Sequence, residues 1–435
     1  TGSVTGGHTR VVERWINNAP EAQTHSVVIL TPNKEVMKTL EFNTKAKNGK
    51  CIYFDKSLSI VEKALKLREL ALHYEYVVLH THMEDVIPTI AFGSEKFTRP
   101  VLLYNNASHM VWIGKSIADV VLDIIKDDTI TKNKRNIQNS FFLGVPSKEI
   151  IYTKPDKKAL RKKLGLPLDK KIIISSGSEQ KYCIIGNDNY ANIIQKLIDE
   201  NTYCYIIGIK RNNEYWKTLE IKSNGHIVPL GYVNFDNGYM DYLSAADLYI
   251  DSYPMSGGTA IMDAISRGVP ALALKTTDIQ LDYFTSTSAY CETESEYIFK
   301  AKKILNDIDY AQKITSELQK SLDEYQSVIQ WNKKVDKMLE KVPKTHSVRI
   351  LTNETDFNIA DDIAVLLNFM TDKNAFNCKS VLKRFIKQSY KDFVKFGINY
   401  SAIGIPYIFQ LLSFKKSGLK TKVIKIFGIN LFVLS

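Results

Sequence analysis

The sequence predicts an α/β protein with two tandem Rossmann-like domains facing a cleft, followed by a basic helical extension. Apolar strands alternate with amphipathic helices in two successive stretches of the chain, and such alternation implies a parallel sheet covered by helices on both faces. The length of 435 residues exceeds the roughly 250 that one core usually reaches. The composition, 44% hydrophobic and 24% charged, is ordinary for a globular protein and excludes a disordered chain.

The first domain is predicted to span residues 1–150. A glycine loop runs directly into a helical pattern at Arg10–Asn17, so a first strand is missing from the pattern. We therefore expect the chain to be a portion of a longer protein, or to have lost a few N-terminal residues. Strands are predicted at Val27–Leu30, Cys51–Phe54, Tyr76–His80 and Val101–Tyr104, with helices at Ile60–His73 and near Asp85–Phe92.

The second domain is predicted to span residues 151–343 and repeats the alternation. A charged segment, residues 154–167, is interpreted as the interdomain link, and a long helical stretch at Glu294–Lys341 closes the domain. The predicted strands are Ile172–Ile174, Tyr203–Gly208, Ile227–Leu230 and Leu248–Asp251, and the predicted helices are Ala191–Glu200, Trp216–Ile221 and Gly238–Ala245. Ligands of such folds meet the carboxyl ends of the strands.

Residues 251–274 are the most informative segment for function. A small-residue loop with Gly257 and Gly258 leads into an amphipathic helix at about Gly258–Arg267 and then a Gly-x-Pro turn. Backbone N–H groups at a helix start favour negative charge, so the loop is predicted to cradle phosphate. Thr259 and Asp263 lie one helical turn apart, which suits a hydroxyl on phosphate and a carboxylate on sugar hydroxyls. The alternative is an ordinary strand-to-helix glycine turn.

Most of the net charge of +11 belongs to the C-terminal tail. Residues 379–425 hold eleven Lys or Arg and one acid, Asp392, a balance of +10 that leaves +1 for the rest. A basic amphipathic helix is predicted at Val381–Phe396, followed by an uncharged stretch at Phe396–Phe414. This pattern favours the interpretation that the extension, residues 344–435, lies in an anionic membrane surface. The alternative interpretation is a helical subdomain with a solvated lysine face. Nothing in it matches a nucleic-acid module, so no nucleic-acid partner is predicted.

The five cysteines are scattered without metal-ligand spacing, so neither a disulfide framework nor a zinc site is predicted. No signal peptide opens the chain. We therefore expect a cytoplasmic protein, with peripheral attachment at the inner face of the cell membrane as the location that the tail favours. No cofactor is predicted, and the oligomeric state is left open.

Four segments in this order and spacing resemble GT-B glycosyltransferases, the class with two Rossmann-like domains that includes glycosyltransferase family 4 and the O-GlcNAc-transferase-like enzymes. The resemblance runs from Gly6 to about residue 341. Its segments are the loop Gly6, Gly7 and His8, similar to an acceptor-side loop; the link Leu160–Pro167; Tyr232 and Val233 with the following Tyr242–Leu248, similar to the lining of a nucleotide base; and Met262–Pro270, similar to the donor-binding helix.

The chain departs from family 4 at one motif. Where retaining enzymes of that family have two glutamates eight residues apart, this chain has Met255 and Asp263. Together with Tyr104–Trp112, this pair is closer to the O-GlcNAc-transferase-like group, which inverts. The stereochemical outcome stays open.

The resemblance implies roles for the loops of the second domain. Lys181, in the loop after the first strand, takes the role of the cation that neutralises charge on a leaving pyrophosphate, a demand that is electrostatic when no metal is present. The donor-binding residues are then Gly177, Lys181, Arg211, Tyr232, Val233, Ser256, Gly257, Gly258, Thr259 and Asp263, with Asp263 on the ribose. An exposed loop lysine and a helix-surface carboxylate are the alternatives for Lys181 and Asp263.

Histidines of the first domain are the candidates for the catalytic base, because imidazole titrates near neutrality. His82 and His109 are the candidates that follow strand ends, with His80 beside His82; His8 is expected to contact the acceptor or cap a helix. A metal site at His80 and His82 with Glu84 and Asp85 is an alternative, but nothing elsewhere supplies converging ligands, and no metal is predicted.

The leading hypothesis is a metal-independent glycosyltransferase of the hexosyl or N-acetylhexosaminyl class. It would move a sugar from a nucleotide donor, UDP-linked by expectation, to a lipid-linked saccharide, a polysaccharide or a protein. A non-catalytic GT-B module that binds a nucleotide sugar or stabilises a partner transferase is the main alternative. A sugar-nucleotide epimerase of the same architecture would need more carboxylates around the cleft than the sequence supplies.

Overall fold

The computed structural model describes two compact units. One comprises residues 1–144 and 335–435 and the other residues 145–334. The described residues are 7–30, 34–82, 85–94, 96–106, 114–124, 137, 139–147, 156–182, 189–234, 238–275 and 282–348, together with the backbone of 421–426 and 429–434. Residues 335–343 were predicted to belong to the second domain, but in the structure they group with the first unit.

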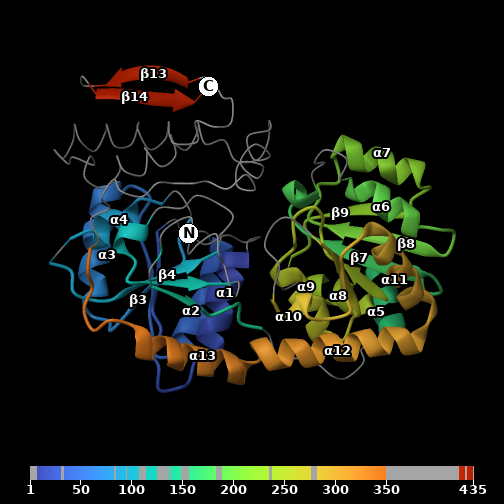
Figure 1. Cartoon of the computed structure of the whole chain (residues 1–435), viewed down its shortest axis with the longest axis horizontal. Helices are drawn as coiled ribbons and strands as arrows, with labels where there is room; N and C mark the ends of the chain where they lie inside the picture. The colour runs from blue at the N-terminus through green and yellow to red at the C-terminus, as the bar shows by residue number, and fades with distance from the viewer. Residues whose placement is uncertain are drawn as a thin grey trace. The chain divides into compact units, whose positions relative to one another are not determined.

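The first unit contains parallel strands joined by helices (Figure 1). Its two parallel sheets are β1 (Val27–Ile29) with β2 (Cys51–Tyr53), and β3 (Val77–Leu79), β4 (Val101–Asn105), β5 (Val120–Asp123) and β6 (Ser140–Phe142) in that order. The helices are α1 (Gly7–Asn18), α2 (Lys34–Ala46), α3 (Ile60–Ala71) and α4 (Ile87–Phe92). The four predicted strands are confirmed, whereas α2, β5 and β6 had not been predicted.

Local sequence explains how these elements begin and pack. Ser59 caps α3 in a capping box: its hydroxyl accepts the Glu62 N–H, and the Glu62 carboxylate accepts the Ser59 N–H at 2.7 Å. Every residue of β4 and β5 is buried, as expected for central strands covered on both faces. Leu67 of α3 and Phe92 of α4 pack in the core over this sheet.

The second unit contains a six-stranded, wholly parallel sheet (Figure 1). Its strands are β7 (Lys171–Ser176), β8 (Thr202–Ile207), β9 (Ile227–Gly231), β10 (Leu248–Ile250), β11 (Ala271–Leu274) and β12 (Tyr290–Cys291), in the spatial order β12-β11-β10-β7-β8-β9. The chain builds outward from β7 in one direction and then returns to place β10 on the other side. The order therefore reverses between β7 and β10, which is where doubly wound folds bind ligands.

The four helices predicted before Glu294 are present, and the predicted helical stretch at Glu294–Lys341 is helical, whereas the helices at Lys157–Leu164 and Asp282–Thr285 had not been predicted. Glu294–Lys341 forms three helices, because Asp307 caps the second at the Tyr310 N–H and Ser327 separates it from the third. The helices are α5 (Lys157–Leu164), α6 (Tyr190–Leu197), α7 (Glu214–Lys222), α8 (Met240–Ala245), α9 (Thr259–Ser266), α10 (Asp282–Thr285), α11 (Glu294–Asn306), α12 (Ile308–Gln326) and α13 (Val328–Lys341).

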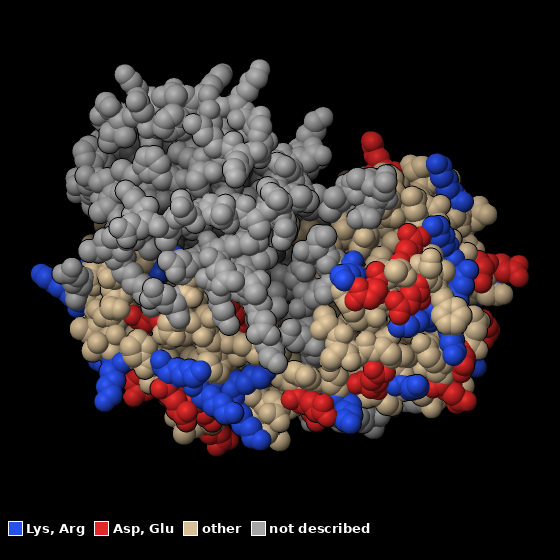
Figure 2. Space-filling view, viewed as in Figure 1, with Lys and Arg blue, Asp and Glu red and all other residues tan. Residues whose placement is uncertain are grey.

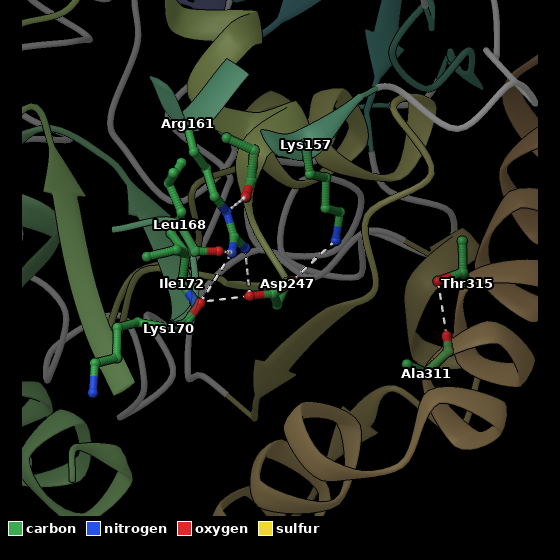
Figure 3. Close-up of polar contacts among 9 residues, drawn as sticks. Lys157, Arg161, Leu168, Lys170, Ile172, Asp247, Ala311 and Thr315 are labelled. Carbon is green, nitrogen blue, oxygen red and sulfur yellow. Dashed lines mark hydrogen bonds and ion pairs between the residues drawn. The ribbon is translucent and has the colours of Figure 1, made fainter. Parts of the chain in front are cut away.

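Helix α5 lies in the segment interpreted as a charged link. Asp156 caps it and Gly165 ends it in the left-handed conformation. Its Arg161 donates to the carbonyls of Ala245, Leu168 and Lys170 and, at 2.6 Å, to the Asp247 carboxylate (Figure 3). Asp247 also accepts the Ile172 N–H, so α5 is fixed to the amino ends of β7 and β10. The charged residues of this segment thus form a helix that an ion pair and hydrogen bonds attach to the sheet, where a link had been expected.

The chain beyond α13 belongs to the first unit and contacts residues from its N-terminal part. His346 lies beside the Asp119 carboxylate at 2.7 Å and the Phe92 carbonyl at 2.8 Å, and Asp119 also accepts the N–H groups of Val101 and Ser347. Residues 421–426 and 429–434 then form antiparallel strands β13 and β14, where a helical extension had been predicted. β-branched residues in this segment, such as Ile424, favour extended backbone.

The predicted amphipathic helix at Val381–Phe396 and the uncharged stretch at Phe396–Phe414 lie outside the described residues. Among the helices that the structure describes, none is both long and apolar enough to cross a membrane. Basic and acidic side chains are interspersed over the described surface in the view of Figure 2. This agrees with the near-neutral charge of the sequence outside the tail.

Candidate active site

Two loops of the second unit meet where the strand order reverses. The segment after β7, Gly177–Lys181, lies against the segment after β10, residues 251–258. The Lys181 ammonium donates to the Ser256 carbonyl, and the Met255 N–H lies 3.4 Å from the Lys181 carbonyl. A Cβ on Gly177 would lie 3.1 Å from the Ser252 hydroxyl oxygen, so glycine permits this close approach. The structure thus brings Gly177 and Lys181 to the predicted phosphate loop.

A buried carboxylate, Asp251, organises the loop after β10. Its Oδ2 accepts the Ser256 hydroxyl at 2.6 Å and its Oδ1 accepts the Gly257 N–H at 2.9 Å. The Ser256 hydroxyl oxygen in turn accepts the Gly258 N–H at 3.2 Å. Burial raises the pKa of Asp251 above its ordinary value, although the Ser256 hydroxyl and the charge of Lys181 act in the opposite direction.

These contacts change which loop groups suit an anion. The Ser256 hydroxyl and the Gly257 and Gly258 N–H groups, all expected to hold phosphate, have partners within the loop. Helix α9 follows with no side-chain cap at its start, and Gly258 before it has a φ of +66°. The first N–H groups of a helix have no intrahelical acceptor. The N–H groups from Thr259 onward are therefore the better placed donors.

Helix α9 carries the predicted pair of Thr259 and Asp263 on one face. Its bounds confirm the predicted helix, and the two residues are four apart within it. Asp263 is buried, with 3% of its surface exposed, and lies near enough to Tyr249 to affect the pKa of that phenol. Thr259 is half-buried at the helix start.

Three further predicted donor residues follow the neighbouring strands. Arg211 comes after β8 and is exposed. It lies beside the end of β9, because a Cβ on Gly231 would be 3.7 Å from the Arg211 Cγ. Tyr232, 52% exposed, and Val233 come directly after β9. Because all strands are parallel, these residues share the carboxyl edge of the sheet with Lys181 and the phosphate loop.

Buried tyrosines support the strand ends beneath the loops. The Tyr190 hydroxyl donates to the Asp251 carbonyl at 2.5 Å, and the Tyr249 hydroxyl donates to the Ser176 carbonyl at 3.3 Å. The Tyr182 hydroxyl lies 2.9 Å from the hydroxyl of Ser175. These bonds fix the ends of β7 and β10 from below. None of these residues was predicted to belong to the site, since an aromatic residue in a strand or helix most often indicates only core packing.

The predicted base candidates belong to the first unit. His82 follows β3 and is exposed, and its carbonyl accepts the Asp85 N–H at 3.0 Å. His80 instead packs its ring against two aromatic side chains, at 5.6 Å from Trp15 and 4.9 Å from Tyr104 between centroids. His109 and Gly6 lie outside the described residues. Gly7 and His8 are the first residues of α1, so the helix begins before Arg10 and these two residues belong to it, where a loop had been predicted.

No group of three or more His, Cys, Asp or Glu side chains able to hold a metal ion occurs among the described residues.

Asp251 is the functional candidate that sequence analysis missed. Its signal was present, because an acidic residue directly after an apolar strand lies at the ligand-binding edge of a parallel sheet.

No protein-family model matches this chain, and neither does any curated protein sequence. Solved structures of glycosyltransferases do resemble it, and the chain has their GT-B fold of two Rossmann-like domains, as the sequence resemblance implied. The Anabaena protein HepE in complex with UDP-glucose is also similar, at a TM-score of 0.59 and 13% identity over 78% of this chain and 98% of that one.

Two further solved structures are similar over a comparable share of the chain. A glycosyltransferase from Rickettsia africae ESF-5 matches with a TM-score of 0.56 and 13% identity, over 78% of this chain and 96% of that one. An O-GlcNAc transferase from Thermobaculum terrenum matches with a TM-score of 0.51 and 12% identity, over 77% of this chain and 65% of that one.

Proposed function

We propose that the protein is a glycosyltransferase that uses a nucleotide-sugar donor, UDP-linked, without a metal ion. The acceptor is a lipid-linked saccharide, a polysaccharide or a protein, and the sugar belongs to the hexosyl or N-acetylhexosaminyl class. One observation carries the proposal: at the reversal point of the sheet, Lys181 contacts the loop that leads into the uncapped start of α9, and Asp263 lies one turn along that helix.

The chemistry of the transfer explains why these groups suit it. Breaking the bond between sugar and diphosphate leaves negative charge on the departing nucleotide. Backbone N–H groups at a helix start and a fixed ammonium stabilise such charge without rearranging, and removing one such donor typically costs about a hundred- to thousandfold in rate. The Lys181 ammonium and the α9 N–H groups supply this stabilisation in place of a metal ion.

The remaining donor contacts follow from the same edge of the sheet. Asp263 accepts hydrogen bonds from the ribose hydroxyls, and Tyr232 offers an exposed ring on which a base stacks. Arg211 adds a second positive charge near the diphosphate. His82 or His109 removes the proton from the acceptor hydroxyl as that oxygen attacks the sugar. The comparison structure that holds UDP-glucose supports the choice of a UDP-linked donor.

Nucleotide binding tests the donor site first. Isothermal titration with UDP, GDP and ADP should give the tightest binding for UDP, and Lys181→Ala and Asp263→Ala should each weaken it at least tenfold. Lys171→Ala is the matched control, because Lys171 is an exposed lysine at the opposite end of β7. Equal UDP affinities in all four proteins would refute the donor site.

Transfer and hydrolysis assays then separate the two remaining functions. A transferase should hydrolyse UDP-sugar slowly in water and release UDP faster when its acceptor is added. A protein that binds UDP yet turns over no donor with lipid-linked, polysaccharide or peptide acceptors would instead be the non-catalytic module.

Membrane association is a separate element of the proposal and rests on the eleven basic residues of 379–425. Flotation with anionic liposomes should recover the full chain and leave behind a chain truncated after residue 348. The truncation keeps His346 and Ser347, because both contact Asp119 of the first unit. Equal flotation of both proteins would remove the anchor from the proposal.

A further inference from the structure

We infer that Asp251 and Ser256 form a clasp that positions the diphosphate-binding loop, and that neither side chain is itself a phosphate ligand. The inference rests on the proposed function and deepens it, because it separates the groups that shape the site from those that touch the donor. The clasp consists of the Asp251 carboxylate, the Ser256 hydroxyl and the Gly257 and Gly258 N–H groups.

The Ser256 hydroxyl shows why this loop differs from a simple phosphate cradle. A hydroxyl has one hydrogen to donate, and that of Ser256 points to Asp251 Oδ2 at 2.6 Å. Its oxygen accepts the Gly258 N–H, so the hydroxyl links the strand end to the residue before α9. A phosphate oxygen can only accept hydrogen bonds and would have to break the Asp251 contact to use this hydroxyl.

The loop has little freedom to adopt another path. A Cβ on Gly257 would lie 2.5 Å from Asp251 Oδ1 and 3.1 Å from the Ser176 carbonyl oxygen, so the loop backbone lies close to the carboxylate. The Lys181 ammonium donates to the Ser256 carbonyl. The clasp therefore sets the position of Lys181 as well as the direction in which α9 begins.

A second aspartate, at the other end of the same strand, provides an internal contrast. Asp247 precedes β10 and has Arg161 at 2.6 Å and Lys157 at 3.2 Å. Burial would raise the pKa of Asp247, but these cations and the Ile172 N–H outweigh it and hold the pKa below the ordinary value. Burial dominates at Asp251, whose pKa is raised. A carboxylate that the fold does not favour in its charged form is typical of a functional position.

Removing Asp251 alone would have two opposite effects on binding of an anion. The loop would lose its anchor, which weakens binding, and a negative charge near the diphosphate would disappear, which strengthens it. A double-mutant cycle separates these effects, because the charge contribution of Asp251 is the same in both arms and cancels.

The experiment measures the affinity for UDP and for uridine, which lacks the phosphates, in the wild type, Asp251→Ala, Ser256→Ala and the double variant. Ser256→Ala should weaken UDP binding about tenfold in the wild-type background and less than twofold in the Asp251→Ala background. Uridine affinity should stay within about twofold throughout. Ser256→Thr, which keeps the hydroxyl, should restore most of the UDP affinity.

Additive losses of UDP affinity, or equal losses for UDP and uridine, would overturn the clasp. A wild type that binds no nucleoside diphosphate would instead overturn the proposed function on which the clasp rests. If Asp251→Ala does not fold, Asp251→Asn with Ser256→Ala completes the same cycle with a smaller change in shape. Asp247→Asn is the control: it should lower the melting temperature and leave the ratio of UDP to uridine affinity unchanged.

Discussion

Replacing Arg161 with alanine should destabilise the second unit strongly, although Arg161 lies far along the sheet from the proposed donor loops. Its side chain is 7% exposed and makes four hydrogen bonds, three to carbonyl oxygens and one to Asp247 (Figure 3). Removing one partner of a buried ion pair typically costs about 3–5 kcal/mol. Asp247 is 24% exposed and keeps Lys157 and the Ile172 N–H, so we expect the lower end, about 3 kcal/mol.

The size of the unit converts this loss into a melting temperature. Residues 145–334 number 190, and for domains of this size 1 kcal/mol corresponds to roughly 2–4 °C. The unfolding transition that includes this unit should therefore fall by roughly 6–12 °C in calorimetry. Lys157→Ala is the control, because its ion pair to the same carboxylate is 3.2 Å long and 40% exposed on the lysine side, and should cost less than about 1 kcal/mol.

The pH dependence gives a second check with a defined sign. The pKa of Asp247 is below its ordinary value of 3.8, so its pairing stabilises the fold above that pH and is lost as the pH falls through the folded-state pKa. The difference in unfolding free energy between wild type and Arg161→Ala should thus be largest at neutral pH and become smaller as the pH falls below 3.8. A melting temperature within 2 °C of the wild type at neutral pH, or a difference independent of pH, would refute the reasoning.

Three smaller perturbations test other parts of the structure. Gly257→Ala places a Cβ 2.5 Å from Asp251 and should cost about 1–3 kcal/mol and abolish the thermal shift caused by UDP; an unchanged shift would contradict it. His346→Ala leaves a gap beside Asp119, because both side chains are fully buried. It should cost about 2–3 kcal/mol in urea denaturation, and a loss under about 1 kcal/mol would contradict this expectation. Ser59→Ala removes the cap of α3 and should cost about 1 kcal/mol, while Ser59→Asp should cost little.

The fold was predictable because its signals are local and repeated. Apolar runs such as Ile172–Ile174 are too short for helices and are bounded by polar turns, and the structure places β7 there. Short strands with weaker patterns were missed: Ser140–Phe142 forms β6 at a sheet edge with only three residues. Helix α5 was missed because its charged face resembles a linker, and only the tertiary contacts of Arg161 reveal why a helix forms there.

The sequence was sufficient to predict which segments form the candidate site, but not which hydrogen bonds those segments make. Glycines and a Thr-to-Asp spacing identify a strand-to-helix loop in the sequence. The partner of the Ser256 hydroxyl depends on Asp251 being buried five residues earlier, which is a fact of packing. The same holds for Tyr190, whose hydroxyl reaches the Asp251 carbonyl from a helix 61 positions away in the sequence.

The return of the chain after α13 to its starting unit affects the order in which the protein can be completed during synthesis. Asp119 receives His346 and Ser347 only after the whole of residues 145–334 has left the ribosome. At about 5–20 residues per second, Asp119 then waits on the order of ten seconds or more for His346 and Ser347. The second unit is continuous in sequence and needs no such wait. A nascent chain can therefore complete the second unit before the first unit, although the first unit begins to be synthesised earlier.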